Sequence, residues 1–354
     1  MFDTTLKTPT GKISFSYVIA TPTQNAVKKL SKSDRALPTI VFLHPVYIGK
    51  IIYHPQFSDR QLRRFNLVAL DLRCHAKTVG RAGPGYGREV AARDVGLFMK
   101  SLEIPKYHIF GVSMGGCVGI QTAILFPECV QSVFVVSSLP LTEPPDVAAG
   151  RQEIFDCWEE GALSNGGKGD LKSEDSAMRD AFTGAVQLSV NGESEEGSVF
   201  DAILRRSIEL LGDKWPKDRL ADWRVATVDF FVLREAYTVQ ALSNIRCPIR
   251  LIHCGADIAY PLESTQVVAD RLKQAGVGNV GVQQVVGAPH FGSVTHAREI
   301  NTLFHAFILS ITSADGPPPP LPVIPKGGKI ESPWVKDLRK CGLEEDEEDD
   351  EDDE

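Results

Sequence analysis

The sequence predicts an α/β protein in which a mostly parallel central sheet is flanked by helices and interrupted by an inserted helical cap. Short apolar runs alternate with segments whose apolar residues recur at helical spacing, a pattern typical of parallel strands joined by helices. This alternation stops at about Leu139 and resumes after Asn244. A chain of 354 residues can bury the core of one large domain that carries such an insertion.

The first part of the predicted sheet domain comprises residues 1–138. Each expected strand is a short apolar run that ends in turn or polar residues. The strands are expected at residues 12–20, 38–44, 65–73, 107–113 and 130–138. Helices are expected at residues 88–102 and 115–125.

The second part of the sheet domain comprises residues 245–312. Here the same alternation predicts a strand, a helix, a strand and a helix, at residues 248–255, 261–276, 281–287 and 296–311. The helical cap is expected at residues 139–244, which lack strand-like runs. Its apolar residues fall in helical register in four segments separated by polar and glycine-rich loops: 153–163, 176–190, 199–211 and 225–242.

Residues 313–354 differ in composition from the rest of the chain. They are rich in proline and glycine and end in the acidic run EEDEEDDEDDE, so we expect a linker followed by a disordered acidic tail. This run explains the formal net charge of −8, because the remaining residues contain 38 basic and 35 acidic groups. Such a balance predicts neither a nucleic acid nor a membrane as a partner.

The remaining compositional features point to a cytoplasmic protein without a cofactor. The N-terminal residues show no targeting pattern, and no apolar run is long enough to span a membrane. The seven cysteines are scattered and show no metal-binding spacing, so we expect reduced thiols and no metal site. The sequence leaves the oligomeric state open.

The candidate nucleophile is Ser113 in the motif Gly111-Val112-Ser113-Met114-Gly115. A predicted strand precedes this G-x-S-x-G motif and a helix rich in small residues follows it. A serine held at a sharp strand-to-helix turn leaves no room for side chains two positions before and after it, which explains both glycines. The motif alone is weak, but its position between a strand and a helix strengthens it.

At these residues the chain resembles the α/β-hydrolase fold family, in particular its capped members, over about residues 10–312. The resemblance implies a catalytic triad in the chain order Ser, Asp, His. Asp257 follows the predicted strand at 248–255, and His290 follows the one at 281–287. His290 would act as the general base and Asp257 would orient it, with Glu143 as the alternative acid.

The resemblance also implies an oxyanion hole made by two backbone N–H groups. Met114, which follows the nucleophile, would supply one of them. The other is expected from Val46, because Pro45 stands where relatives usually have glycine and proline has no N–H. The stretch Asp71-Leu72-Arg73-Cys74-His75-Ala76 is similar to a family turn, and we interpret it, together with Asp94, as structural.

These residues predict a serine hydrolase that cleaves a small, mostly apolar carboxylic ester or lactone through an acyl-enzyme. Tyr47 and Phe291, beside the oxyanion and histidine loops, are expected to contact the substrate. Arg234 could meet a carboxylate, but the sequence assigns it no role. A C–C bond hydrolase, an acyltransferase, an amidase and a non-catalytic ligand-binding protein remain as alternatives.

Overall fold

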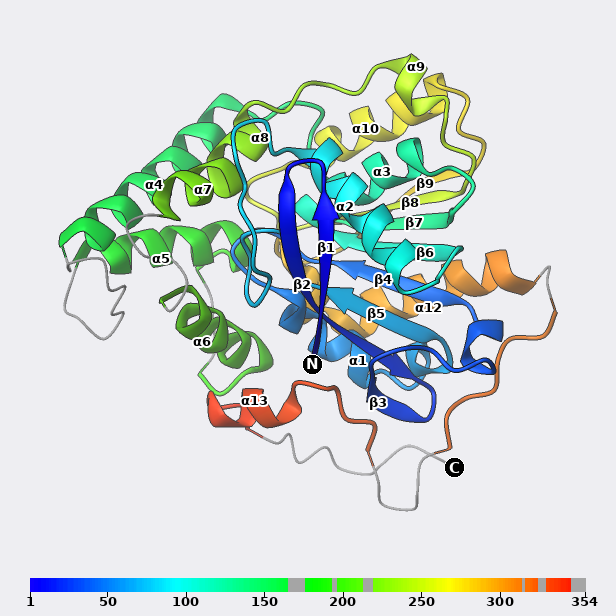
Figure 1. The fold of residues 1–354 in the computed structure, drawn as a ribbon. Helices are drawn as coiled ribbons and strands as arrows, with labels where there is room; N and C mark the ends of the chain where they lie inside the picture. The colour runs from blue at the N-terminus through cyan, green and yellow to red at the C-terminus, as the bar shows by residue number, and fades with distance from the viewer. Residues whose placement is uncertain (165–175, 193–195, 213–218, 314–315, 324–328, 345–354) are drawn as a thin grey trace.

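The computed structural model describes residues 1–164, 176–192, 196–212, 219–313, 316–323 and 329–344 (Figure 1). Nine strands in this part of the chain form one sheet in the order β1-β2-β5-β4-β6-β7-β8-β9, with β3 paired to β2. Strands β5, β4, β6, β7, β8 and β9 are parallel, whereas β2 is antiparallel to β1, β3 and β5. The predicted fold class is therefore confirmed. The strand bounds are β1 Phe2–Thr8, β2 Gly11–Thr21, β3 Gln24–Val27, β4 Thr39–Leu43, β5 Asn66–Leu70, β6 Tyr107–Val112, β7 Val130–Val136, β8 Ile249–Cys254 and β9 Val280–Val285.

Helices cover both faces of the sheet, and alternate residues of each strand pack against opposite layers. In β4, Val41 and Leu43 belong to one buried cluster and Ile40 and Phe42 belong to the other. The first cluster includes α2 (Arg88–Ser101), α3 (Met114–Leu125) and α10 (Leu262–Gln274). The second includes α1 (His54–Ser58), α11 (Gly292–Thr295) and α12 (Ala297–Thr312). Figure 1 shows α2 and α3 in front of the sheet and α12 behind it.

Two strands at the antiparallel edge, β1 and β3, were not expected from the sequence. Strand β1 is partly exposed along its length, and its only apolar residues are Phe2 and Leu6. Strand β3 has four residues, none of them buried. Both strands form through backbone pairing with β2 rather than through apolar runs of their own, so hydrophobic periodicity gave no signal.

Most helices of the segment between β7 and β8 lie together beside the sheet, on the side to which the β4 and β5 arrows point, whereas its last helix lies near α10 (Figure 1). No strand occurs in its described residues. The helices are α4 Pro145–Ser164, α5 Ser176–Val190, α6 Val199–Gly212, α7 Leu220–Arg224, a π-helical turn Val225–Asp229, α8 Phe230–Val232 and α9 Val239–Leu242. We refer to this segment as the cap and keep 139–244 as its predicted bounds.

The expectation of a disordered tail from residue 313 requires correction for residues 329–344. This stretch contains α13 (Val335–Lys340), and Trp334 is only 1% exposed. The indole ring packs edge-on against Phe57, with ring centroids 4.8 Å apart. The prediction used the average composition of residues 313–354, and this average did not reflect the large apolar area that one tryptophan can bury. The acidic run from residue 345 onward lies outside the described residues.

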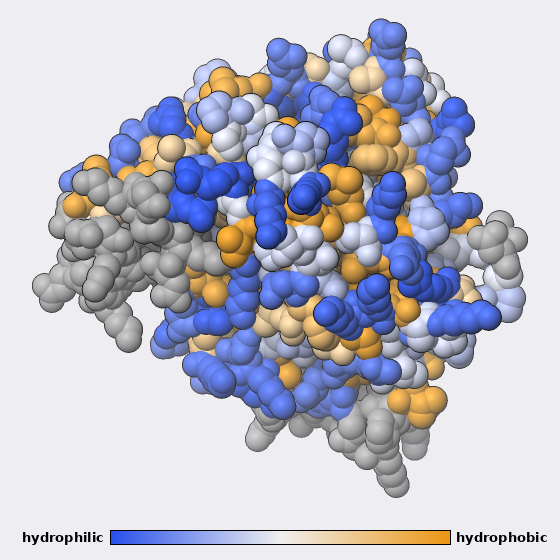
Figure 2. All heavy atoms as spheres, in the orientation of Figure 1, coloured by the Kyte–Doolittle hydropathy of each residue, from blue (hydrophilic) through white to orange (hydrophobic). Residues whose placement is uncertain are grey.

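The visible surface is mostly polar. Figure 2 shows hydrophilic side chains over most of this face, with apolar atoms in small separate areas. Within the described ranges, no helix is both long and apolar enough to cross a membrane. All seven cysteines are free of disulfides.

Helix α3 approaches the sheet so closely that two glycines are required at its start. A Cβ on Gly115 would collide with the carbonyl group of Leu43 in β4. A Cβ on Gly111 would lie 2.5 Å from the carbonyl oxygen of Gly115. The position of Ser113 therefore depends on backbone contacts that tolerate no side chain on either glycine.

We predict that Gly115→Ala destabilises the fold by at least about 3 kcal/mol, because backbone atoms cannot yield as a flexible side chain can. Gly150→Ala in α4 is the matched control, since a Cβ there meets no atom within 4 Å. Alanine in a helix should leave stability equal or raise it by about 0.5–1 kcal/mol. Urea denaturation of both variants checks this, and equal midpoints would contradict it.

We predict that Trp334→Ala costs about 3–5 kcal/mol of unfolding free energy, since it empties a fully buried site. Val323, which is 94% exposed, provides the control. Val323→Ala should change stability by less than about 0.5 kcal/mol. Thermal or chemical unfolding measures both, and a tryptophan variant as stable as the wild type would show that the C-terminal segment is not docked.

We predict that His54 makes the fold acid-sensitive. Burial lowers its pKa to about 4 from an ordinary 6.5, and its Nδ1 lies 2.6 Å from Ser332 Oγ in the C-terminal segment. The unfolded chain takes up the proton first as the pH falls, so stability is lost below about pH 6.5 and the loss levels off near pH 4. Between pH 7 and pH 5 the free energy of unfolding of the wild type should fall by about 2 kcal/mol more than that of His54→Asn. Urea denaturation at several pH values measures this. The same dependence of unfolding free energy on pH in wild type and His54→Asn would show that His54 does not cause the acid sensitivity.

Candidate active site

Ser113 lies at a sharp turn between β6 and α3. Its backbone has φ 52° and ψ −113°, a conformation that L-residues adopt only under constraint. Its N–H donates to Val136 O in β7 at 2.9 Å, and its carbonyl accepts from Cys117 N in α3 at 3.0 Å. The hydroxyl is thereby presented at the ends of the parallel strands, at the start of a helix.

The three side chains predicted as a triad are hydrogen-bonded in series. His290 Nε2 lies 2.9 Å from Ser113 Oγ, and His290 Nδ1 lies 2.6 Å from Asp257 Oδ2. Asp257 Oδ1 accepts two backbone N–H groups, from Ala259 at 2.9 Å and Tyr260 at 3.1 Å. Both side chains are buried, at 7% and 1% exposure for His290 and Asp257. The imidazole thus has a carboxylate on one nitrogen and the hydroxyl on the other.

Two contacts hold the histidine loop in place. The hydroxyl of Ser137, at the end of β7, donates to His290 O at 2.6 Å. The N–H of Phe291 donates to Ser189 O at 2.8 Å, and Ser189 belongs to cap helix α5. The loop that carries His290 is therefore fixed by both the sheet and the cap.

The loop after β4 brings Val46 and Tyr47 to the nucleophile. Both residues line the same small cavity as Ser113, His290 and Phe291. The ring of His44 stabilises the loop, since Leu72 N–H donates to its Nε2 at 2.8 Å and its Nδ1 contacts Pro45 O at 2.7 Å. Burial lowers the pKa of His44 to about 4, so the ring is neutral at pH 7.

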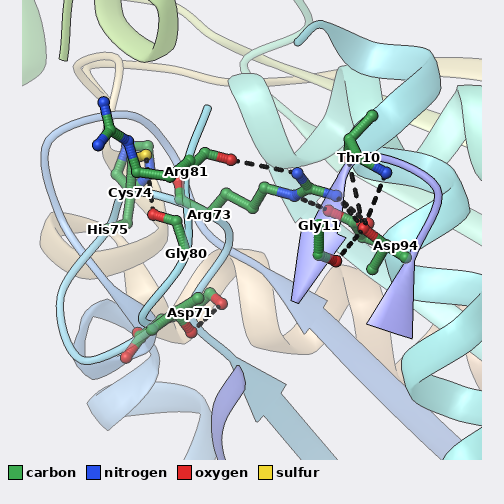
Figure 3. Close-up of polar contacts among 11 residues, drawn as sticks. Thr10, Gly11, Asp71, Arg73, Cys74, His75, Gly80, Arg81 and Asp94 are labelled. Atoms are coloured by element: carbon green, nitrogen blue, oxygen red, sulfur yellow. Dashed lines mark hydrogen bonds and ion pairs between the residues drawn. The ribbon is translucent and has the colours of Figure 1, made fainter. Parts of the chain in front are cut away.

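The turn after β5, which the sequence marked as structural, is tied down by buried ion pairs (Figure 3). Arg73 lies 2.5 Å and 2.7 Å from the two carboxylate oxygens of Asp94 in α2. Asp71 pairs with Lys50 Nζ at 2.5 Å. Arg73 also donates to Arg81 O at 3.2 Å, which closes the loop shown in Figure 3. None of these residues lines the cavity at Ser113.

Glu143, the alternative acid, does not contact His290. It accepts from Arg151 Nε at 2.6 Å and from Arg234 Nη2 at 3.0 Å. Burial alone would raise its pKa, but the two guanidinium groups outweigh burial and hold the pKa below its ordinary value. The hydroxyl of Tyr260 also donates to Glu143, at 2.8 Å.

Sequence reasoning missed Arg151 and Tyr260, which line the cavity with Ser113. Tyr260 lies three residues after Asp257, a spacing that could have marked it. Arg151 is an isolated basic residue in a predicted helical region, and no motif distinguishes it from other cap arginines.

A second cavity lies between the cap and the sheet domain, and its walls are largely apolar. It shares Tyr47 and Ser189 with the cavity at Ser113. Trp158 and Trp223 form part of its wall, with ring centroids 5.6 Å apart. Both tryptophans also belong to the buried core, so the cap aromatics serve packing and cavity lining together.

Comparisons with known proteins find chains of similar sequence and fold. Residues 38–164 match the family model described as alpha/beta hydrolase fold. The probable alcohol acetyltransferase of Wickerhamomyces anomalus is 29% identical over 37% of this chain, but the match spans only 38% of that protein's length. The pimeloyl-[acyl-carrier protein] methyl ester esterase of Yersinia pseudotuberculosis is 25% identical over 76% of this chain and 92% of its own.

The solved enol-lactonase of Burkholderia xenovorans LB400 superimposes with a TM-score of 0.59 at 16% identity. It covers 85% of this chain and 97% of its own. Relatives and structural neighbours thus include esterases and lactonases. The match over residues 38–164 and the likeness to solved structures together show that the chain has the α/β-hydrolase fold.

Proposed function

We propose that this protein is a serine hydrolase that cleaves a small, mostly apolar carboxylic ester or lactone through an acyl-enzyme. The observation that carries the proposal is the hydrogen-bonded series Ser113, His290, Asp257, with separations of 2.9 and 2.6 Å. A serine hydroxyl is a weak nucleophile at neutral pH and needs a base within hydrogen-bonding reach. The choice of bond is supported by the similarity to a methyl ester esterase and to a solved enol-lactonase.

In the first half of the reaction Ser113 Oγ attacks the substrate carbonyl carbon while its proton moves to His290 Nε2. Asp257 keeps the Nδ1 proton on the imidazole directed toward itself and stabilises the imidazolium. The new C–Oγ bond leaves negative charge on the carbonyl oxygen. The backbone N–H groups of Met114 and Val46 would bind this oxygen.

Collapse of this intermediate breaks the ester C–O bond, and His290 returns the proton to the departing alkoxide. A water molecule then attacks the acyl group while His290 takes its proton. The acyl-enzyme C–Oγ bond breaks as His290 returns that proton to Ser113 Oγ, which releases a carboxylic acid and restores the free enzyme. With a lactone the departing hydroxyl stays attached to the acyl chain, so the product is a hydroxy acid. Tyr47 and Phe291 would contact the acyl or alcohol portion, because both line the cavity at Ser113.

Acyl transfer to an alcohol is a second candidate, favoured by burial of the nucleophile. Ser113 is 1% exposed and the cap lies over it, so an alcohol bound in the apolar cavity could reach the acyl-enzyme in place of water. The resemblance to an alcohol acetyltransferase points the same way. Product analysis of a short ester incubated with ethanol distinguishes the two, because transfer yields an ethyl ester and hydrolysis yields only acid.

We predict that a fluorophosphonate probe labels wild type stoichiometrically at Ser113 and that Ser113→Ala abolishes both labelling and ester turnover. Asp257→Asn should retain the fold and lower kcat by roughly 10³ to 10⁴, because the imidazole loses its orienting carboxylate. Ser138→Ala is a control, since this buried serine lies outside the triad. Peptide mass spectrometry and a short-ester assay provide the measurements. Undiminished turnover in Ser113→Ala would refute the function.

A further inference from the structure

A buried charge cluster lies within the cap, where it also contacts Tyr260 of the sheet domain, and it carries one uncompensated positive charge. Glu143, just after β7, contacts two cap arginines, Arg151 of α4 and Arg234 after α8. The three side chains are 1%, 4% and 2% exposed. Glu143 is the only acid among the described residues that forms an ion pair with either arginine. Two cations and one anion leave a net charge of +1.

Arg151 is held in place by several contacts, but one edge of its guanidinium group, at Nη1, has no hydrogen-bond partner among the described residues. Its Nε donates to Glu143 and its Nη2 donates to Tyr260 Oη at 3.0 Å. One face of the guanidinium lies over the ring of Phe231, with Cζ 3.6 Å from the centroid. Nη1 is buried and makes no hydrogen bond to any described residue. A buried charged donor without a partner is unfavourable, so a ligand that accepts from it would gain binding energy.

The open edge belongs to the cavity that holds the nucleophile. Arg151 lines this cavity together with Ser113 and His290, and so does Tyr47. The hydroxyl of Tyr47 is also buried; it lies close to the Arg151 side chain but makes no hydrogen bond of ordinary length and angle with any described residue. Burial raises the pKa of Tyr47 despite the nearby Arg151 charge, so the hydroxyl stays protonated at neutral pH. None of the described residues lining this cavity is acidic.

We propose that Arg151 and Tyr47 bind a carboxylate of the substrate, so that the preferred substrate is an ester or lactone with a second, ionised carboxyl group. The inference rests on the proposed hydrolase function. A carboxylate offers two oxygen atoms, one for Nη1 and one for the hydroxyl, and its single negative charge balances the net +1. A phosphate dianion would leave an excess negative charge.

The neighbouring apolar cavity accounts for the rest of such a substrate. It adjoins the first cavity through Tyr47 and Ser189 and is lined by Trp158 and Trp223. A methylene chain or the alcohol group of the ester fits these walls, whereas the ionised end requires Arg151. The structure therefore assigns an apolar and an anionic subsite to the two parts of one substrate.

The test compares monomethyl adipate with dimethyl adipate, which differ only in the ionised end. Wild type should favour the half-ester in kcat/KM by on the order of 10- to 100-fold, the range for a charged hydrogen bond. In Arg151→Met the ratio of kcat/KM for the half-ester to kcat/KM for the diester should fall to about 1, mainly because KM for the half-ester rises. Glu143 keeps Arg234 as an ion-pair partner in this variant. Arg151→Lys keeps the positive charge but lacks the planar guanidinium donors, so it should retain part of the preference for the half-ester.

Arg224→Met is the matched control. Arg224 also lies in the cap over an aromatic ring, with Cζ 5.3 Å from the centroid of Phe155, but it lines neither cavity. This variant should keep the wild-type preference. Melting temperatures of all variants establish that each is folded.

Binding without turnover separates this inference from the hydrolase function. Monomethyl adipate should raise the melting temperature of Ser113→Ala but not of Ser113→Ala with Arg151→Met. Ser113-dependent cleavage without preference for the half-ester overturns the carboxylate site and leaves the hydrolase standing. Absence of all ester cleavage, with Arg151-dependent binding intact, overturns the hydrolase and supports the site. No binding to Ser113→Ala overturns the site.

Discussion

The close approach of α3 to the sheet is the constraint on which the site depends. Gly111 and Gly115 let backbone meet backbone, and this contact fixes Ser113 in a conformation with positive φ. The parallel order of β6, β7, β8 and β9 then brings the loops after them to one edge. Asp257 and His290 reach the serine because each follows a strand of that series. Without the glycines the strand order would still assemble the loops, but the hydroxyl would lie elsewhere.

Sequence reasoning was most successful where a residue of suitable chemistry also stood at the expected position after a predicted strand. The strands from β4 to β8 are short, largely buried apolar runs, so periodicity found them. The motif at Ser113 became more specific because a strand precedes it and a helix follows it. Asp257 and His290 were placed by their positions after late strands, and the structure brings both to Ser113. Val46, which follows Pro45, lines the cavity at Ser113.

The features that escaped prediction depend on tertiary partners rather than on local pattern. Strands β1 and β3 exist because β2 pairs with them. Trp334 is one apolar residue in a polar stretch, and only the surface around Phe57 gives it a site. Arg151 resembles any helix arginine until Glu143, Tyr260 and Phe231 surround it. The role proposed for it rests on its position in the fold and not on its neighbours in the chain.

The docked C-terminal segment also affects how the cap can open. Ser332 contacts His54 in the sheet domain, and Glu344 N–H donates to Gly197 O before α6 at 3.3 Å. The cap is thus fastened to the sheet domain by this non-covalent bridge as well as by its two chain connections. Displacing α6 from the sheet domain would therefore break the hydrogen bond between Glu344 and Gly197. Cleavage of the chain before Ser332 would release that restraint and leave the triad residues unaltered.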